Sequence, residues 1–292
     1  MRKKVIRTTI TLVNDRFADG TNRIVAENLR TSCSVQFGGG AIVPTADIAI
    51  YGLNMQAMNK LMRIRWQDIQ SLQNIVRIDA GEEGEELALV YEGQITFGYI
   101  DMSSAPDAAF RIRSTAAAYD MFNPASPITY AGPTSVVQAI AGLCAKMGRL
   151  FENSGVPESL MMEDVTLVDT DMNKVRKLCK DYQIDLYVEQ NVITIAPRGA
   201  PRLMRVPVLT PETGLIGYPI PTMQGIEFQC LYDPFVRFGG LVRIRDSLLE
   251  TANGEWRVFG VTIDLESIIP GGKWFMNVKA ARNEPSNVAI SR

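Results

Sequence analysis

The residues of this chain that could do chemistry are mainly carboxylates on predicted strands. Asp264 and Glu266 lie two residues apart in such a strand, and side chains alternate between the two faces of a sheet, so both carboxylates are expected on one face. Paired carboxyl groups are the acid and the nucleophile or base of most glycoside hydrolases. Asp185 and Glu189 form a second acidic pair in another predicted strand. Solvent-facing strand positions explain both pairs at least as well, so a carboxylate-based cell-wall hydrolase is an alternative hypothesis here.

The chain contains no histidine among its 292 residues. Histidine is the usual general base near neutral pH and a common metal ligand, so its absence excludes histidine-dependent serine and cysteine hydrolases and imidazole zinc sites. No phosphate-binding glycine motif opens a helix either, because Gly38-Gly39-Gly40 precedes a strand-like segment and predicts a bend. We therefore predict no catalytic residue, no cofactor and a protein that is not an enzyme.

Neither the cysteines nor the densest acidic cluster has the spacing of a metal site. The carboxylates of Glu82–Glu86 follow one another in a predicted hairpin turn and lack the Asp-x-Asp-x-Asp order of a calcium loop. No two cysteines form a CxxC pair, so we expect them to be small buried residues of a protein made in a reducing compartment. The cysteines are Cys33, Cys144, Cys179 and Cys230. The sequence thus predicts no metal site.

Pairs of arginines separated by one residue recur along the chain. On a strand, alternation places both guanidinium groups of a pair on one face. Such a face is either solvated or meets acidic partners or threading DNA, and the sequence leaves both readings open. The pairs are Arg63-x-Arg65, Arg111-x-Arg113 and Arg243-x-Arg245.

The most distinctive segment, residues 228–244, predicts a strand, a corner at Asp233-Pro234 and a second strand. Aromatic side chains at such a corner either pack inward or contact another chain, because exposed aromatic surface is costly. The aromatic, acidic and arginine residues of this segment are therefore our candidate partner-interface residues. They are Tyr232, Asp233, Phe235, Phe238, Arg243 and Arg245.

Composition indicates a folded protein without a general affinity for nucleic acid or membranes. Apolar residues make up 46% of the chain, and the net charge of −2 with a pI near 5.5 gives no bulk attraction to polyanions. No stretch reaches the ~18 apolar residues of a membrane helix. The residues after Met1–Lys4 alternate like a strand, where a signal peptide is continuously apolar. We therefore expect a soluble protein that is made in the cytoplasm and has no membrane partner.

Hydrophobic periodicity divides the chain into three predicted domains, residues 1–127, 128–198 and 199–292. The first contains short alternating segments at near-regular spacing, which indicates an antiparallel barrel or sandwich. Its predicted strands are Val5–Val13, Asn28–Phe37, Thr45–Leu53, Asn74–Ala80, Leu87–Met102 and Ala109–Asp120, with one short helix at Met55–Met62.

The second predicted domain is a small helix–helix–hairpin module. Residues 134–150 and 169–183 carry the apolar stripe of an amphipathic helix, with Thr134 or Ser135 as the cap of the first. Residues 185–188 and 192–196 predict a hairpin that turns on Gln190-Asn191.

The third predicted domain returns to strands after a connector rich in proline and glycine. Asn253-Gly254 predicts a tight hairpin turn, and residues 283–292 a loose tail. The predicted strands are Ile226–Leu231, Leu241–Asp246, Glu255–Leu265 and Lys273–Ala280. No long internal sequence repeat is apparent. We predict an α+β fold that is predominantly β, with two antiparallel barrels flanking the module.

Several segments resemble, in this order, the baseplate hub proteins of contractile phage tails, the family that includes late control protein D. The carboxy-terminal segments are Thr213–Pro219, Gln224–Phe228, Leu231–Pro234 and Gly239–Ile244. Asp169–Pro197 resembles the central module of the same family, and Val90–Ile95 resembles its first barrel.

This resemblance implies a structural protein with two tube-like β-barrels around the module. It implies a homotrimeric ring that adapts the hexameric tail tube to the trimeric spike and surrounds the DNA-ejection channel. The implied partners are two further copies, the tube protein, the spike and other baseplate proteins, with only transient passage of DNA. The implied location is the tail baseplate of the virion, after synthesis in the host bacterial cytoplasm. A distal-tail or tube-initiator protein of another tail type is the alternative.

Overall fold

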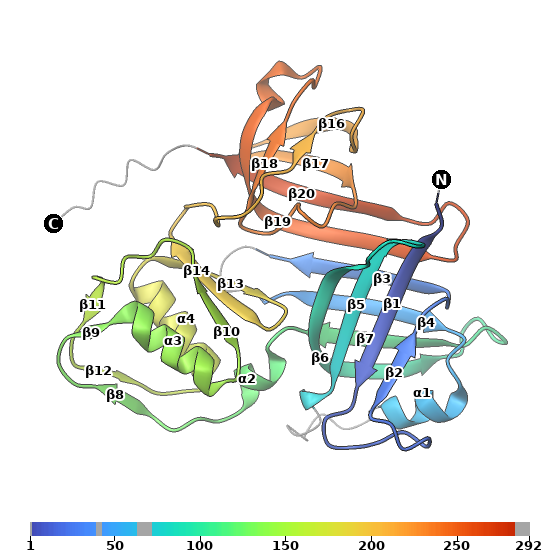
Figure 1. Cartoon of the computed structure of the whole chain (residues 1–292), viewed down its shortest axis with the longest axis horizontal. Helices are drawn as coiled ribbons and strands as arrows, with labels where there is room; N and C mark the ends of the chain where they lie inside the picture. Colours follow the sequence, from blue (N-terminus) through green and yellow to red (C-terminus); the bar gives the residue numbers. More distant parts are fainter. Residues whose placement is uncertain (1, 39–42, 63–71, 284–292) are drawn as a thin grey trace.

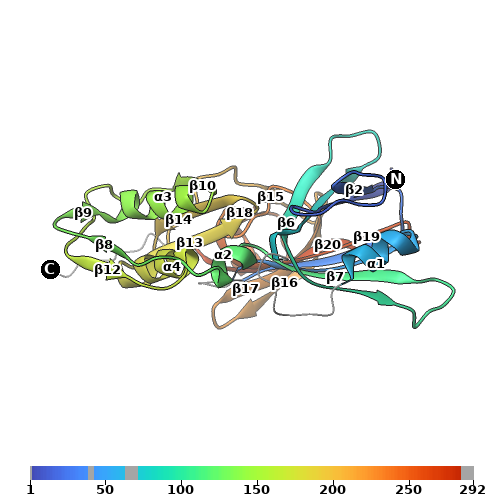
Figure 2. The ribbon, with the colours of Figure 1, turned by 90° about the horizontal axis from the view of Figure 1, so that it is seen from below.

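A computed structural model describes residues 2–38, 43–62 and 72–283 of the chain. It is predominantly β, with a large sheet and a small module beside it that contains the two longest helices (Figures 1 and 2). Arg63-x-Arg65, part of the glycine run and most of the predicted tail lie outside the described residues. No helix in the described residues is long and apolar enough to cross a bilayer.

The large sheet contains strands from both ends of the chain. From the amino-terminal part come β1 Lys4–Thr11, β2 Arg23–Ala26, β3 Thr31–Phe37, β4 Thr45–Tyr51, β5 Ile75–Glu82, β6 Ala88–Asp101 and β7 Ala109–Thr115. From the carboxy-terminal part come β15 Val208–Leu209, β16 Leu215–Thr222, β17 Gly225–Leu231, β18 Leu241–Ile244, β19 Gly254–Ser267 and β20 Trp274–Arg282. The short helices α1 Met55–Leu61, α2 Ala118–Phe122 and the 3-10 helix η2 Glu250–Ala252 lie in the connections.

These strands form one sheet of 13 strands, in the order β16-β17-β20-β19-β3-β4-β7-β6-β5-β1-β2, with β18 and β15 branching from β19. The two parts of the chain join where β19 pairs with β3 in antiparallel register. The two predicted barrels are therefore not separate sheets, because a strand of the third segment is hydrogen-bonded to a strand of the first. No pairing closes a barrel among the described strands, so the two-barrel arrangement stays a prediction.

The sheet contains an internal duplication of topology. In chain order, β3, β4, β5, β6 and β7 take the spatial order β3-β4-β7-β6-β5, and β16 to β20 take the matching order β16-β17-β20-β19-β18. A register shift interrupts β6 between Ile95 and Phe97, and another interrupts β19 between Val258 and Gly260. The repeat lies in the order of the strands, and it is compatible with the absence of a long sequence repeat.

Oppositely charged residues face each other across neighbouring strands in equivalent places of the two halves. Asp47 faces Arg113 across β4 and β7, and Glu227 faces Lys279 across β17 and β20. Likewise Arg77 faces Glu92 across β5 and β6, and Arg243 faces Glu255 across β18 and β19. Because few equivalent residues are identical, the repeat is clear in the strand pairing and faint in the sequence.

The module has its own apolar core, to which the segments 136–144, 172–179 and 184–195 contribute their buried apolar side chains. Its helices are α3 Val136–Lys146 and α4 Asp171–Asp181, and its strands are β8 Ile128–Tyr130, β9 Thr134–Ser135, β10 Leu150–Asn153, β11 Met161–Met162, β12 Val165–Leu167, β13 Ile184–Glu189 and β14 Val192–Pro197. Ser135 caps α3 by accepting from the backbone N–H of Gln138, and Thr170 caps α4 in the same way. Both predicted helices and the predicted hairpin are confirmed.

The predicted tight turn at Asn253-Gly254 is wrong. A two-residue turn of this type needs positive φ at both positions, and Asn253 has a φ of −70°. The strands β18 and β19 do form a hairpin, but residues 245–253 connect them. The Asn253 side chain closes this longer loop, since it accepts from the Ser247 N–H at 3.0 Å and donates to the Ser247 carbonyl at 3.1 Å.

Candidate functional site: the polar face of the shared sheet

Eight neighbouring strands, from β16 to β6, form a continuous wall with one apolar and one polar face. The apolar face belongs to the core, where Val35, Ile263 and Met276 are buried. The pairing registers align the polar side chains in rows that cross both halves of the chain. One row is Gln229, Asn277, Thr262, Gln36, Thr45, Thr115 and Gln94. The wall therefore presents one shared polar surface, which we take as the candidate functional site.

Cations on this polar face are matched by carboxylates on adjacent strands. Arg113 lies 3.2 Å from Asp47, and Lys279 lies 3.0 Å from Glu227. All four side chains are exposed, so these pairs contribute little to the free energy of unfolding. Their effect is on the charge of the face, because each cation is accompanied by an anion.

Arg111 is neutralised in the same way. Its Nε donates to Asp101 at 2.6 Å, and both Arg111 and Arg113 point to the polar face as predicted. Hydrogen bonds from Ser103 and from Arg111 lower the pKa of Asp101 to about 2, so this carboxylate stays ionised at neutral pH. The arginine pair is thus not a free basic patch, which removes one attraction for DNA.

Asp264 and Glu266 lie on the same face of β19, as their spacing predicts. They line an open groove of about 350 Å³ together with Ser32, Ser34, Tyr99 and Lys273. Asp264 accepts from the Asn277 amide at 3.4 Å, and Glu266 accepts from the backbone N–H of Lys273 at 2.9 Å. No group of three or more potential metal ligands occurs in the parts of the chain described here. In this setting the two carboxylates add negative charge to the face.

The aromatic candidates of the corner take different environments. Phe235 is 45% exposed, and the Arg205 guanidinium lies 4.2 Å from its ring centroid. Phe238 is buried and packs inward, edge to face on Tyr187 at 5.1 Å between centroids. Of the two phenylalanines, only Phe235 offers its ring to solvent. Arg205 was not predicted, because nothing in the sequence connects it with the corner.

The remaining candidate residues shape the corner and the strand after it. The Tyr232 ring contacts Trp274 edge to face at 6.0 Å, and Asp233 accepts from the Phe235 N–H at 2.9 Å. Further along, Arg243 donates to Glu255 at 3.1 Å while Arg245 is exposed. The structure therefore brings residues 232–238 together and places the two arginines on and after β18. Contact of these residues with a partner stays a prediction.

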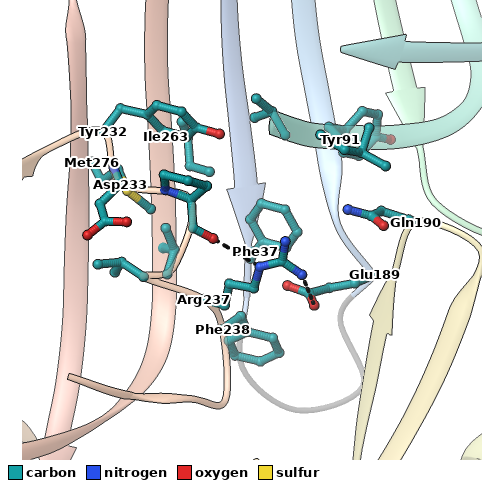
Figure 3. A pocket seen from close by; sticks show the side chains of 15 residues that line it. Phe37, Tyr91, Glu189, Gln190, Tyr232, Asp233, Arg237, Phe238, Ile263 and Met276 are labelled. Atoms are coloured by element: carbon teal, nitrogen blue, oxygen red, sulfur yellow. Dashed lines mark hydrogen bonds and ion pairs between the residues drawn. The ribbon is translucent and has the colours of Figure 1, made fainter. Parts of the chain in front are cut away.

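The corner meets the module at a small cavity of about 30 Å³ (Figure 3). Arg237 from the corner donates to the Pro234 carbonyl at 3.0 Å and lies 3.9 Å from the carboxylate of Glu189, at the tip of the β13–β14 hairpin. Tyr91 of β6 and Phe37 of β3 also line the cavity. All three predicted domains thus meet around this cavity.

A buried arginine fastens the module to the carboxy-terminal part of the sheet. Arg202 donates to Glu189 at 2.7 Å, to the Phe238 carbonyl at 3.1 Å and to Thr194 at 3.3 Å. The side chains of Arg202 and Glu189 are 6% and 10% exposed. Because both charges are buried, each depends on the other for compensation. We call this pair the clasp.

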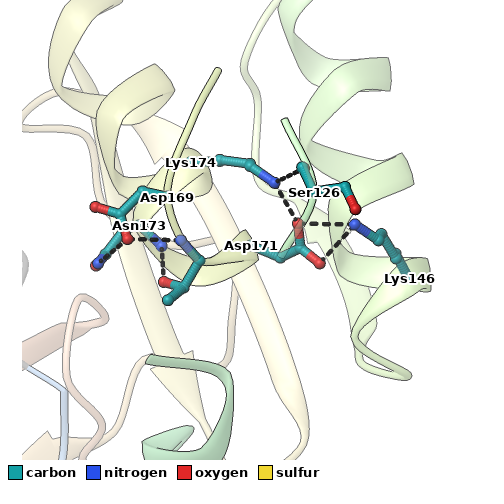
Figure 4. A network of polar contacts seen from close by, with 7 residues as sticks. Ser126, Lys146, Asp169, Asp171, Asn173 and Lys174 are labelled. Atoms are coloured by element: carbon teal, nitrogen blue, oxygen red, sulfur yellow. Dashed lines mark hydrogen bonds and ion pairs between the residues drawn. The ribbon is translucent and has the colours of Figure 1, made fainter. Parts of the chain in front are cut away.

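A second buried network lies inside the module (Figure 4). Lys174, fully buried in α4, donates to the Ser126 carbonyl at 2.6 Å and to Asp171 at 2.9 Å. Lys146 of α3 lies 3.0 Å from the same Asp171 carboxylate. Asp171 thereby connects the two helices, and Lys174 extends the network to Ser126 in the segment that enters the module.

We expect Asp171→Asn to destabilise the module by about 2 kcal/mol, because Lys174 keeps its buried charge but loses its anion. Burial by itself raises the pKa of Asp171, but hydrogen bonds from Lys174 and Lys146 outweigh this and leave the pKa below its ordinary value of 3.8. The stabilisation is therefore complete above the unfolded-state pKa and is lost as the pH falls through the folded-state pKa. Urea unfolding between pH 3 and pH 7 measures this, with the exposed Asp181→Asn as control.

One family model and several solved structures match most of the chain. A family model described as baseplate hub gp41 matches residues 5–270. No curated protein sequence matches the chain. Solved structures with a similar fold include a 43 kDa tail protein of prophage MuSo2 from Shewanella oneidensis, with 8% identity, a TM-score of 0.62 and coverage of 97% of each chain.

Two further structures share the fold. A tail protein from Neisseria meningitidis has 9% identity and a TM-score of 0.61, over 95% of this chain and 97% of that one. An E. coli component of the type VI secretion system, itself similar to the T4 tail proteins gp27 and gp5, has 13% identity and a TM-score of 0.63, over 88% of this chain and 74% of that one. At these identities the similarity establishes the fold alone.

Proposed function

The chain belongs to the baseplate hub gp41 family, and on that premise we propose that it is a structural hub subunit of a contractile phage tail. In this proposal three copies form a ring that joins the hexameric tail tube to the trimeric spike. The ring surrounds the channel through which DNA leaves, and the protein has no enzymatic role. The virion baseplate is its location, after synthesis in the host cytoplasm.

The observation that carries this proposal is the duplication of topology within the sheet. Each chain holds two equivalent five-strand units in a single continuous sheet. Three such chains present six equivalent units, so a trimer can meet a six-fold tube on one side and a three-fold spike on the other. A chain with a single unit lacks this adaptor property. Closure of each unit into a tube-like barrel is part of the same proposal.

The charge of the polar face supports its assignment to the channel wall. Arg111, Arg113 and Lys279 are each paired with a carboxylate, and the carboxylates of Asp264 and Glu266 outnumber the one further cation of their groove, Lys273. Strong phosphate binding needs unpaired cations. A wall of this charge lets DNA pass without holding it, which suits transient passage.

We expect light scattering of the purified chain, over a concentration series, to give a mass near three times the 32.3 kDa subunit. The duplication is the physical reason, because three chains supply six units. A stable hexamer contradicts the proposed ring and favours the alternative of a tube-initiator or distal-tail protein. Mixing with the tube and spike proteins then tests whether the trimer takes both as partners.

A further inference from the structure

The helical module has a strand edge that no other described strand covers. Its three-stranded sheet has the order β10-β14-β13, so β13 pairs with β14 alone. The backbone N–H of Arg198 donates to the Gln183 carbonyl at 3.2 Å, and every second residue of an antiparallel strand bonds the same neighbour. The N–H and C=O groups of Ile184 and Leu186 therefore point away from β14. In the described parts of the chain, neither residue makes a backbone hydrogen bond on that side.

An open groove of about 670 Å³ runs along this edge. Ile184, Asp185 and Leu186 line it from β13, and the second half of α4 lines it from the other side. The helix packs beside β13, as Figure 2 shows. An exposed strand edge with a groove next to it is a place where an extended peptide adds as a further strand.

The groove also collects positive charge. Residues 128–198 contain seven basic and nine acidic side chains, so the module as a whole does not favour anions. Four of the seven basic residues nevertheless line this groove, together with only two carboxylates. They are Arg176, Lys177, Lys180 and Arg198, with Asp181 and Asp185.

Both carboxylates of the groove already have partners inside the chain. Asp181 accepts from Lys177 at 2.6 Å. Asp185 accepts from the backbone N–H of Gly199 at 2.9 Å and lies 3.6 Å from Arg257. Lys180 and Arg198 are exposed, and neither forms an ion pair with a described carboxylate. The groove therefore offers two cations to the carboxylates of a ligand.

We propose that this groove binds an extended acidic segment of a partner protein, which adds to β13 as a fourth strand of the module. The backbone of the segment supplies the donors and acceptors that the free edge lacks. Side chains of a strand alternate between its two faces, so every second side chain of the segment faces α4 and the cation of Lys180. Aspartate or glutamate at alternate positions is the expected pattern. This docking function goes beyond the proposed ring and does not depend on the number of copies in it.

A nucleic acid matches the groove less well than a peptide. Its phosphates are attracted to the same cations. It has, however, no row of alternating N–H and C=O groups that could pair with the free edge of β13. The combination of an unpaired edge with unpaired cations therefore favours an acidic peptide.

Fluorescence anisotropy with the full chain tests the part of charge. The probe is a labelled peptide of alternating glutamate and valine, and the comparison peptide has lysine in place of glutamate. We expect only the acidic peptide to bind, and its affinity to fall as the salt concentration rises. Lys180→Glu is expected to weaken binding at least about tenfold, because it places a like charge beside the ligand. Arg23→Glu, the same change of charge at an exposed arginine of β2 without an ion pair, is the matched control and should leave binding unchanged.

Hydrogen exchange tests the addition of a strand. In the free chain, the N–H groups of Ile184 and Leu186 should exchange faster than those of Asp185 and Tyr187, which face β14. With the acidic peptide bound, we expect the exchange of Ile184 and Leu186 to slow at least about tenfold. The strand β14 is paired on both sides and should keep its exchange rates.

Each other result contradicts the proposal. Absence of binding by the acidic peptide, or equal binding of the lysine peptide, overturns it. Binding that leaves the exchange of β13 unchanged shows capture by charge alone and overturns the added strand. Single-stranded DNA that binds with the same sensitivity to Lys180→Glu and displaces the peptide identifies a site for nucleic acid instead.

Discussion

Arg202→Ala is expected to destabilise the protein by about 3 to 5 kcal/mol at neutral pH, which is the usual cost of leaving one partner of a buried ion pair uncompensated. Glu189 keeps a buried carboxylate, and Arg237 is too far away, at 3.9 Å, and too exposed to replace Arg202. The Phe238 carbonyl and Thr194 also lose a donor. Urea unfolding measures the loss of stability.

The same variant is expected to loosen the module from the sheet, because the clasp joins β13 and β14 to the corner. Hydrogen exchange of residues 184–197 should increase more than that of β3 and β4. Arg198→Ala, an exposed arginine four residues away, is the matched control and should change stability by less than about 0.5 kcal/mol.

A double replacement separates the charge from the shape. Glu189→Met with Arg202→Met removes both charges, and we expect it to recover much of the stability lost in Arg202→Ala, because apolar residues often replace buried ion pairs without loss. If the double variant is as unstable as the single one, the clasp acts through its hydrogen bonds to the corner and not through charge.

Gly225→Ala is expected to cost about 4 kcal/mol, which combines overpacking with backbone strain. Gly225 has a φ of +146°, and a Cβ there lies 2.1 Å from the Ala280 carbonyl oxygen. That oxygen belongs to β20, which pairs with β17 from Ile226 to Leu231. The added methyl group therefore pushes β17, and β16 with it, away from β20. Thermal unfolding and the oligomeric mass both report this.

Gly254→Ala is a matched control for this effect. Gly254 has a similar φ of +133°, but no atom lies within 4 Å of the position of its added Cβ. It therefore has the backbone strain without the steric clash, and we expect a cost about 2 kcal/mol smaller. Equal costs in the two variants contradict the steric argument at Gly225.

The module is the part of the fold that the sequence predicts best. Its helices and hairpin depend on contacts close in the chain: a Ser135 or Thr170 cap, an apolar stripe and a turn at Gln190. The same local logic places Arg111 with Arg113, and Asp264 with Glu266, on common faces, because strand periodicity does not depend on the neighbouring strand.

The tight turn predicted at Asn253-Gly254 fails for the opposite reason. The loop before β19 is longer than local signals indicate, and the Asn253 side chain is used to close it by bonding Ser247. The backbone conformation of Asn253 is therefore set by the contact of its side chain with Ser247, and the turn propensity of an Asn-Gly pair takes no account of such a contact. Phe235 and Phe238 are similar: which ring is exposed depends on Tyr187 and Arg205, which come from other segments.

By itself, the sequence determined a predominantly β chain with a helical module in the middle, exposed polar strand faces and a resemblance to tail hub proteins. Only the tertiary structure decided that β19 pairs with β3, that two units of five strands share one spatial order, and that Glu189 forms an ion pair with Arg202. Alternation fixes which way a side chain points, but the partner of a strand is chosen by packing and hydrogen bonding over more than two hundred residues of chain. For that reason the polar wall emerges only when both halves of the chain come together.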